Sequence, residues 1–207
     1  MQKKLFYLIY KPYGINSQFS GDYNLKSIMG LEDVSIDVYP VGRLDRESEG
    51  LLILTNEKSL NDILIGPANL VHKEYWVQVD GAINEEVIHK LISGLSLKLP
   101  GGKVHKCAPA LAKRMNPPAI PEREPPVRFR KSIPTSWISI TLQEGKNHQV
   151  RRMTAAVGFP TLRLIRIKLG PFELPEWEPG AVQLIPENEV VNRLRQYKSP
   201  FSKQGYS

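Results

Sequence analysis

The chain has 207 residues, 41% of them hydrophobic, which is enough for one sizeable domain or two small lobes and excludes disorder of the whole chain. Its single cysteine, Cys107, excludes an intramolecular disulfide and a thiolate cluster for zinc. The four histidines show no pair at metal-ligand spacing, and no hydrophobic run is long enough to span a bilayer. We therefore expect a cytoplasmic protein without a membrane segment or a metal site.

The formal charge of +7 is distributed unevenly along the chain. Residues 101–168 contain 14 Lys or Arg against 3 Asp or Glu, so the remainder of the chain is net acidic. Such segregation favours a surface that follows phosphate groups over a general solubility device. It predicts an anionic partner, and nucleic acid in particular.

Strands and short helices alternate in the predicted structure of the first hundred residues. Strands are typically bounded by turn residues, and helices begin at capping side chains and end at glycine. On these grounds we expect strands at 5–10, 37–41, 51–54 and 74–79, a turn at 11–14, a helical turn at 25–29, a helix at 57–65, and a helix that Asn84 caps and Gly94 ends.

Residues 100–134 hold 8 of the 17 prolines, so we expect no regular structure through the middle of this segment. It is also basic, and it could be either a plain surface loop or an insertion that contacts RNA. Beyond it, the alternating pattern at 137–142 predicts a strand. We further expect a strand at 161–169, a helix at 188–197, and a frayed tail from residue 198.

Between these last strands, Asn147 is positioned to cap a helix that Gly158 ends. The helical spacing directs one side chain set inward, namely Val150, Met153 and Val157. The same spacing gathers a basic set on another edge, namely His148, Arg151 and Arg152. A basic edge near a helix N-terminus suits a carboxylate or a phosphate.

Residues 42–56 are the most informative segment, with the sequence G-R-L-D-x-x-S-x-G-L-L-I-L-T-N. It places Asp45 between two arginines, on a loop that enters a hydrophobic strand. Loops fixed on a rigid sheet are common positions for catalytic groups. A purely structural interpretation is that Asp45 pairs with Arg43 or Arg46 at a turn.

This segment resembles the signature of the pseudouridine synthases that modify ribosomal RNA. In that family the aspartate is catalytic, which implies the same role for Asp45. Residues 73–77 (KEYWV) and 145–153 (GKNHQVRRM) resemble two further family motifs. They imply that Tyr75 faces the target base and that Arg151 forms an ion pair with Asp45.

The resemblance also implies the remaining RNA contacts. Arg43 can either fill the space that a flipped uridine leaves or hold a phosphate. Contacts that position the RNA backbone are expected from a set of four residues. These are Lys73, Lys146, His148 and Arg152.

The implied fold is α+β, with a central, mostly antiparallel mixed sheet in two lobes and flanking helices. Residues 1–197 would form the catalytic domain, and 198–207 a disordered tail. The chain begins almost directly at this domain, whereas most relatives carry a small RNA-binding module of the ribosomal protein S4 type before it. Residues 130–138 and 158–166 resemble the subgroup that acts on the large ribosomal subunit.

The implied reaction breaks the glycosidic bond of a uridine, turns the base and rejoins it through carbon 5, which needs no cofactor. The expected partner of this monomeric enzyme is large-subunit (23S) ribosomal RNA, naked or partly assembled. Small-subunit (16S) ribosomal RNA and transfer RNA remain alternatives, as does a non-catalytic protein that assists ribosome assembly. A metal-dependent phosphodiesterase using Asp45, Glu47 and Glu49 is disfavoured because Arg43 and Arg46 would compete with the cation.

Overall fold

The structure is a computed structural model that describes residues 3–25, 37–66, 69–98, 100–128, 130, 132–174 and 178–203. The predicted helical turn at 25–29 lies almost entirely outside these residues. The chain divides into two compact units, one formed by residues 1–72 and 166–207 and the other by residues 73–165. We call them unit 1 and unit 2 and describe each by itself.

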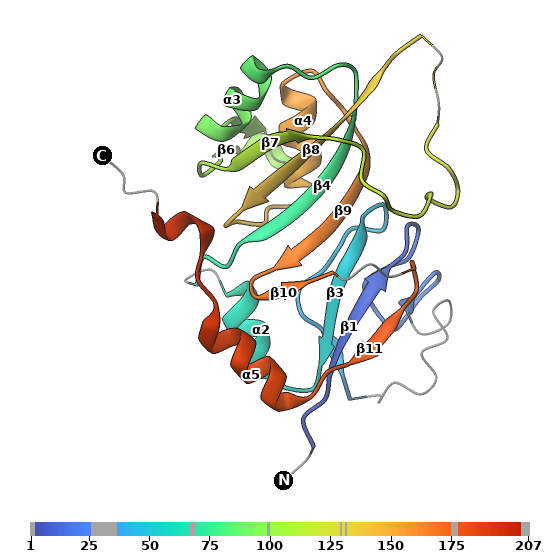
Figure 1. Cartoon of the computed structure of the whole chain (residues 1–207), viewed down its shortest axis with the longest axis vertical. Coiled ribbons are helices and arrows are strands. Elements are labelled where there is room, and N and C mark those ends of the chain that lie inside the picture. The colour runs from blue at the N-terminus through green and yellow to red at the C-terminus, as the bar shows by residue number, and fades with distance from the viewer. Residues whose placement is uncertain are drawn as a thin grey trace. The chain divides into compact units, whose positions relative to one another are not determined.

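Unit 1 is built on antiparallel pairs around β3 (Glu49–Thr55), all of whose residues are buried. β1 (Phe6–Lys11) pairs with β3 on one side and with β11 (Val182–Leu184) on the other. β9 (Thr161–Leu169) crosses from unit 2 into unit 1 at Arg166, and its unit 1 portion lies beside β3. The short strands β2 (Tyr39–Pro40) and β10 (Phe172–Glu173) extend this sheet (Figure 1).

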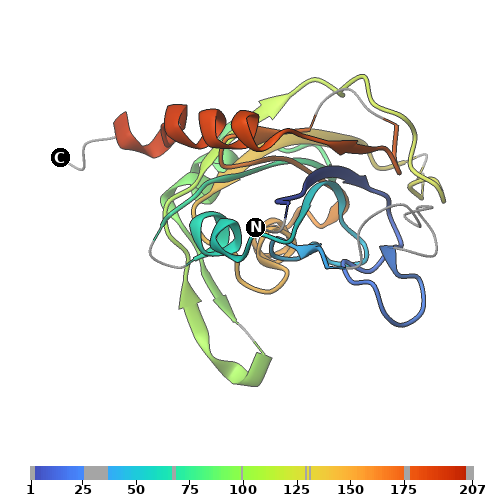
Figure 2. The ribbon, with the colours of Figure 1, turned by 90° about the horizontal axis from the view of Figure 1, so that it is seen from below.

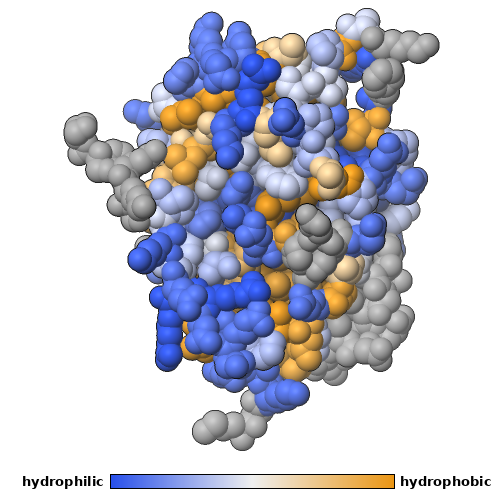
Figure 3. Space-filling view, viewed as in Figure 1, coloured by the Kyte–Doolittle hydropathy of each residue, from blue (hydrophilic) through white to orange (hydrophobic). Residues whose placement is uncertain are grey.

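Two helices cover the hydrophobic core of unit 1. They are α2 (Lys58–Ile65), which contributes Leu60 and Leu64, and α5 (Glu187–Gln196), which contributes Val190. Figure 3 shows hydrophilic residues over α5 and hydrophobic residues over β11, where Leu184 is 52% exposed. The chain continues into the short 3-10 helix η3 (Pro200–Lys203).

Unit 2 contains the antiparallel strands β4 (Lys73–Asp80), β8 (Thr135–Leu142) and β7 (Leu111–Met115), in that order. α3 (Glu85–Ser93) and α4 (Gln149–Ala156) pack on one face of this sheet. Their buried side chains join Val77 and Val79 of β4 and Ile138 and Ile140 of β8 in a single core. A separate hairpin is formed by β5 (Ser96–Lys98) and β6 (Val104–Lys106), joined through the 3-10 turn η2 (Pro100–Gly102).

Most predicted elements are confirmed, including the strands at 5–10, 51–54, 74–79, 137–142 and 161–169. Asn84 caps α3 through its side chain, as predicted. The predicted strand at 37–41 shortens to Tyr39–Pro40. No regular element occurs at 116–134 in the residues that the structure describes, although 104–106 and 111–115 do form strands.

The predicted Asn147 cap of α4 is wrong. His148 occupies the cap position in a left-handed conformation (φ 52°, ψ 30°) and makes no side-chain cap bond. The helix ends at Ala156, just before Gly158 (φ +90°), as predicted. None of the described helices combines the length and hydrophobicity that a bilayer crossing requires.

Candidate active site

The loop that carries Asp45 is fixed on both sides of that residue. Before it, the Ser17 hydroxyl donates to the Leu44 carbonyl (2.8 Å), while the Leu44 backbone N–H donates to the Ser17 oxygen (3.0 Å). After it, the Gly14 N–H donates to the Arg46 carbonyl (2.9 Å), and Arg46 Nε donates to the Gly14 carbonyl (2.9 Å). The half-buried Asp45 side chain therefore projects from a backbone held at its two neighbours.

The fully buried side chain of Lys11 also supports this loop. Its Nζ donates to three backbone carbonyls, those of Ile15 (2.8 Å), Pro12 (2.9 Å) and Arg46 (3.4 Å). Burial lowers the pKa of Lys11 to about 7, which the charges of Glu49 and Asp45 oppose. A buried amine is thus an electrostatic neighbour of the candidate catalytic carboxylate. The sequence around Lys11 indicated only a turn and did not predict this position.

The strand that follows Asp45 is shaped by a close backbone approach. Gly50 has φ +103°, and a Cβ there would lie 2.4 Å from the Arg166 carbonyl oxygen, so only glycine fits. Arg166 is itself buried, and its Nε donates to the Leu51 carbonyl (2.8 Å). The glycine of the signature is therefore explained by packing between β3 and β9 within unit 1.

The two arginines beside Asp45 differ in their surroundings. Arg43 is exposed. The guanidinium of Arg46 lies 4.4 Å from the centre of the Tyr23 ring and its Nε is bound to Gly14, so this side chain is engaged by the 14–23 segment. Both arginines are exposed, and Arg46 is the one that the 14–23 segment engages.

Tyr75 lies in unit 2, on the face of β4 that also carries Val77 and Val79. It is half-buried, pairs with Ile140 of β8 in the strand register, and packs against the core to which α4 contributes Val150 and Met153. The ring is therefore held on the sheet face that α4 covers. Asp45 and Arg43 belong to unit 1, whereas Tyr75 and the other predicted residues belong to unit 2.

The residues of 145–153 take different positions around α4. Lys146 and His148 are exposed on the loop before the helix, and Arg151 is half-buried. Arg152 donates to the carbonyls of Asn147 and Lys98, both at 3.1 Å, and so links the loop to β5. Lys73 is only 9% exposed and lies against Gly145, so it offers little surface to an RNA.

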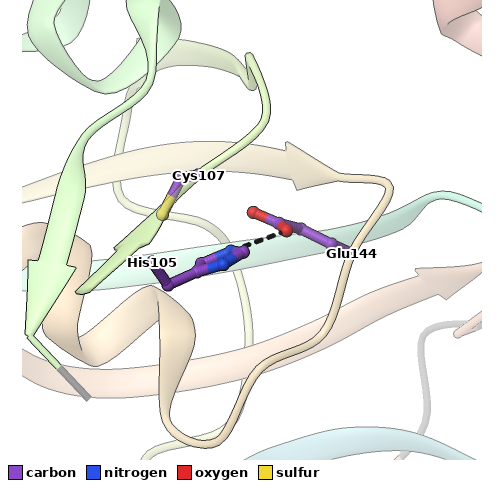
Figure 4. A group of neighbouring side chains, drawn as sticks. All are labelled: His105, Cys107 and Glu144. Carbon is purple, nitrogen blue, oxygen red and sulfur yellow. Dashed lines mark hydrogen bonds and ion pairs between the residues drawn. The ribbon is translucent and has the colours of Figure 1, made fainter. Parts of the chain in front are cut away.

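A carboxylate fixes the loop before α4. Glu144 accepts hydrogen bonds from the Ala108 N–H (3.0 Å) and the Gln149 side chain, and it pairs with His105 Nε2 (2.9 Å) (Figure 4). The other end of the Gln149 amide accepts from the Lys146 N–H (2.9 Å). This network explains why Gln149, a motif residue to which the sequence assigned no role, is buried.

His105, Cys107 and Glu144 also place three possible metal-ligand atoms within 4.8 Å of one another. Zinc is the ion that such a donor set would suit. Hydrogen bonds already engage both carboxylate oxygens of Glu144, and burial together with Glu144 raises the pKa of the Cys107 thiol. We therefore interpret these three residues as a hydrogen-bonded cluster that anchors the loop before α4.

The family model described as RNA pseudouridylate synthase matches residues 5–156. The chain is 46% identical over 180 residues to ribosomal large subunit pseudouridine synthase E of Vibrio parahaemolyticus, covering 87% of this chain and 73% of that one. It is 43% identical over 175 residues to the protein of the same name from Xanthomonas axonopodis pv. citri, covering 83% and 89%. It is 31% identical over 195 residues to ribosomal large subunit pseudouridine synthase B of Bacillus subtilis, covering 94% and 72%.

Solved structures agree on the fold. A crystal structure of a pseudouridylate synthase superposes with a TM-score of 0.75 at 23% identity, covering 94% of this chain and 75% of that one. The α+β prediction with a mostly antiparallel sheet is thereby confirmed.

Proposed function

The chain belongs to the RNA pseudouridylate synthase family, and on this premise we propose that it isomerises a specific uridine of large-subunit (23S) ribosomal RNA to pseudouridine. The observation that carries the choice of RNA is the identity of 42–46% to relatives named for the large subunit. The enzyme is an isomerase. We further propose that it acts as a monomer, in the cytoplasm, on naked or partly assembled RNA.

Asp45 is the proposed catalytic residue. The reaction breaks the bond between ribose C1′ and uracil N1, and forms a bond between C1′ and C5. The proton leaves C5, and N1 gains one, so the product is an isomer of the substrate. The Asp45 carboxylate either attacks C1′ or takes a proton from the sugar, and both routes need a fixed carboxylate. The backbone clamps at Leu44 and Arg46 support this role.

The other site residues position the substrate. In this proposal Arg151 pairs with Asp45 and orients it, and Tyr75 presents its ring to the uracil. A uridine in folded RNA must leave its stack to reach Asp45, and the exposed Arg43 is placed on the Asp45 loop to fill that space. Lys146, His148 and Arg152 hold the RNA backbone, whereas the buried Lys73 contributes chiefly to the packing of the 145–149 loop.

Replacing Asp45 by asparagine tests the proposal. Wild type and Asp45→Asn are incubated with unmodified large-subunit RNA without added metal or cofactor, and pseudouridine is mapped by primer extension after carbodiimide treatment. We expect a single new stop with wild type and a loss of at least about 10⁴-fold in rate with Asp45→Asn, at little cost in RNA affinity. Glu47→Gln, an exposed neighbour on the same loop, is the control and should retain activity.

A stop that appears on small-subunit or transfer RNA instead would change the proposed substrate but support the proposed reaction. No stop on any of these RNAs or on immature particles would show a non-catalytic RNA-binding protein. Equal activity of wild type and Asp45→Asn would remove Asp45 from the mechanism.

A further inference from the structure

The β5–β6 hairpin extends from unit 2 as a two-stranded arm (Figure 2). Its tip carries Gly101 (φ +80°) and Gly102 (φ +78°), and a Cβ added at either position would meet nothing within 4 Å. The tip therefore lies in open space. Nothing in the catalytic role proposed for Asp45 requires such an arm.

The two faces of the hairpin have different chemistry. In the strand register, Ser96 pairs with Lys106, Leu97 with His105, and Lys98 with Val104. Because side chains alternate along a strand, Lys98, Val104 and Lys106 share one face, and all three are exposed. Lys103 follows the tip and is also exposed. Residues 94–110 contain no Asp or Glu, so no carboxylate of the hairpin offsets these charges.

The opposite face holds the hairpin in place. Leu97 is 3% exposed and belongs to the unit 2 core, and His105 binds Glu144. The Lys98 carbonyl, at the tip end of β5, accepts from Arg152 of α4, so the arm is tied to the helix whose entry loop carries Lys146 and His148. An arm held by contacts along its strands and basic on its outer face loses little conformational freedom when an anion binds.

We propose that the β5–β6 hairpin is an RNA-binding arm, on which Lys98 and Lys106 of the outer face and Lys103 beside the tip contact phosphates of the substrate RNA outside the reacting nucleotide. Lysines on an extended hairpin suit a nucleic-acid backbone, since they follow spaced phosphates without reading sequence. The exposed Val104 (64% exposed) gives the same face an apolar contact for a ribose or a base. The identity of the RNA rests on the proposed function, but the arm itself does not require turnover.

The test replaces all three lysines by glutamine. Binding to an unmodified large-subunit RNA transcript is measured from 50 to 300 mM salt in the Asp45→Asn background, so that the result is independent of catalysis. We expect the triple variant to bind about 10- to 100-fold more weakly at 0.1 M salt, with a salt slope lower by about 2 to 3. In a matched control, glutamine replaces three exposed lysines of unit 1, namely Lys3, Lys58 and Lys198. This control should change the RNA affinity less than about threefold.

Two further measurements separate charge from structure. Arginine at the three positions should restore affinity, because it keeps the positive charge at the same places on the hairpin. With an active Asp45, the glutamine variant should raise KM and leave the rate at saturating RNA unchanged. Equal affinity of the hairpin and control variants, or failure of the arginine variant to rescue binding, would refute the RNA-binding role of the hairpin. Absence of pseudouridine in wild type would refute the proposed function and leave the binding result standing.

Discussion

Two loops carry most of the predicted chemistry, and they are held in opposite ways. The Asp45 loop in unit 1 is fixed through its carbonyls, which receive donors from the buried amine of Lys11 and from Ser17. The loop before α4 in unit 2 is fixed by the half-buried carboxylate of Glu144, which accepts from the Ala108 N–H and the Gln149 side chain, and by the Lys146 N–H, which donates to the Gln149 amide oxygen. A buried amine donor thus supports the loop of the acidic residue, and a carboxylate acceptor supports the loop of the basic residues.

This difference has an electrostatic consequence. When protonated, Lys11 places positive charge near Asp45, although burial lowers its pKa to about 7; Glu144 lies on the loop that leads to Lys146 and Arg151. Neither support group carries a charge of the same sign as the candidate residues on its loop, so like-charge repulsion is avoided at both loops. The supports differ in burial, because Lys11 is fully enclosed while the Glu144 side chain is 19% exposed. Breaking the first should therefore cost more than breaking the second.

Lys11→Met is expected to have the largest effect. It removes a donor from three carbonyls, and a buried polar group left without a partner costs about 1–3 kcal/mol. Because the Arg46 carbonyl adjoins Asp45, we expect the folded variant to form pseudouridine at least about 10-fold more slowly while binding RNA normally. Chemical unfolding and single-turnover kinetics provide the measurements, with the exposed Lys3→Met as the control.

The pH dependence of stability sharpens this prediction. Burial lowers the pKa of Lys11 to about 7 in the folded state, below its ordinary value of 10.5. Between these two values the unfolded chain binds the proton and the folded chain does not, so stability rises with pH across this window. The unfolding free energy of wild type minus that of Lys11→Met should increase from pH 7 to 9.5, by on the order of 3 kcal/mol. Parallel pH curves for the two proteins would show that Lys11 titrates normally.

Glu144→Gln should have an intermediate effect. It removes one charge-assisted acceptor from His105, Ala108 and Gln149, and we expect a loss of about 1–2 kcal/mol in local stability. Cys107 is the only cysteine, is 3% exposed and follows β6, so its thiol reports opening of this region. The labelling rate of Cys107 should increase about 10-fold in the variant and stay unchanged in Glu122→Gln, an exposed position of the same unit.

The sequence indicated the candidate residues of the two loops, but it did not indicate the residues that support these loops. Asp45 and Arg151 lie in segments that match family motifs at nearly every position. The strands and helices around them follow from hydrophobic periodicity and capping residues. Lys11 could not be recognised as buried, because lysine is ordinarily exposed and its local context of Pro12 and Gly14 indicates only a turn. The contact of His105 with Glu144 joins residues 39 positions apart, which only the fold can bring together.

Local rules also failed where the backbone departs from regular geometry. Asn147 is a good capping residue, yet the left-handed backbone at His148 moves the start of α4 to Gln149. The strand Leu111–Met115 was not predicted, because Lys113 and Arg114 are exposed on it and its sequence does not alternate. Both departures lie in the basic segment 101–168.

Lys146→Ala should have the smallest effect, because it removes one exposed charge and leaves the backbone hydrogen bond of Lys146 to Gln149 in place. If its side chain contacts one phosphate, RNA affinity at 0.1 M salt should fall about 2- to 5-fold and the salt slope by about 0.7 to 0.9. Lys58→Ala removes an exposed lysine of unit 1 and serves as the control. An unchanged salt slope would exclude Lys146 from the phosphate contacts. Glu144 would then support this loop for the sake of Arg151 alone. A reduced slope that adds to that of the hairpin lysines would show that the loop and the arm bind separate phosphates.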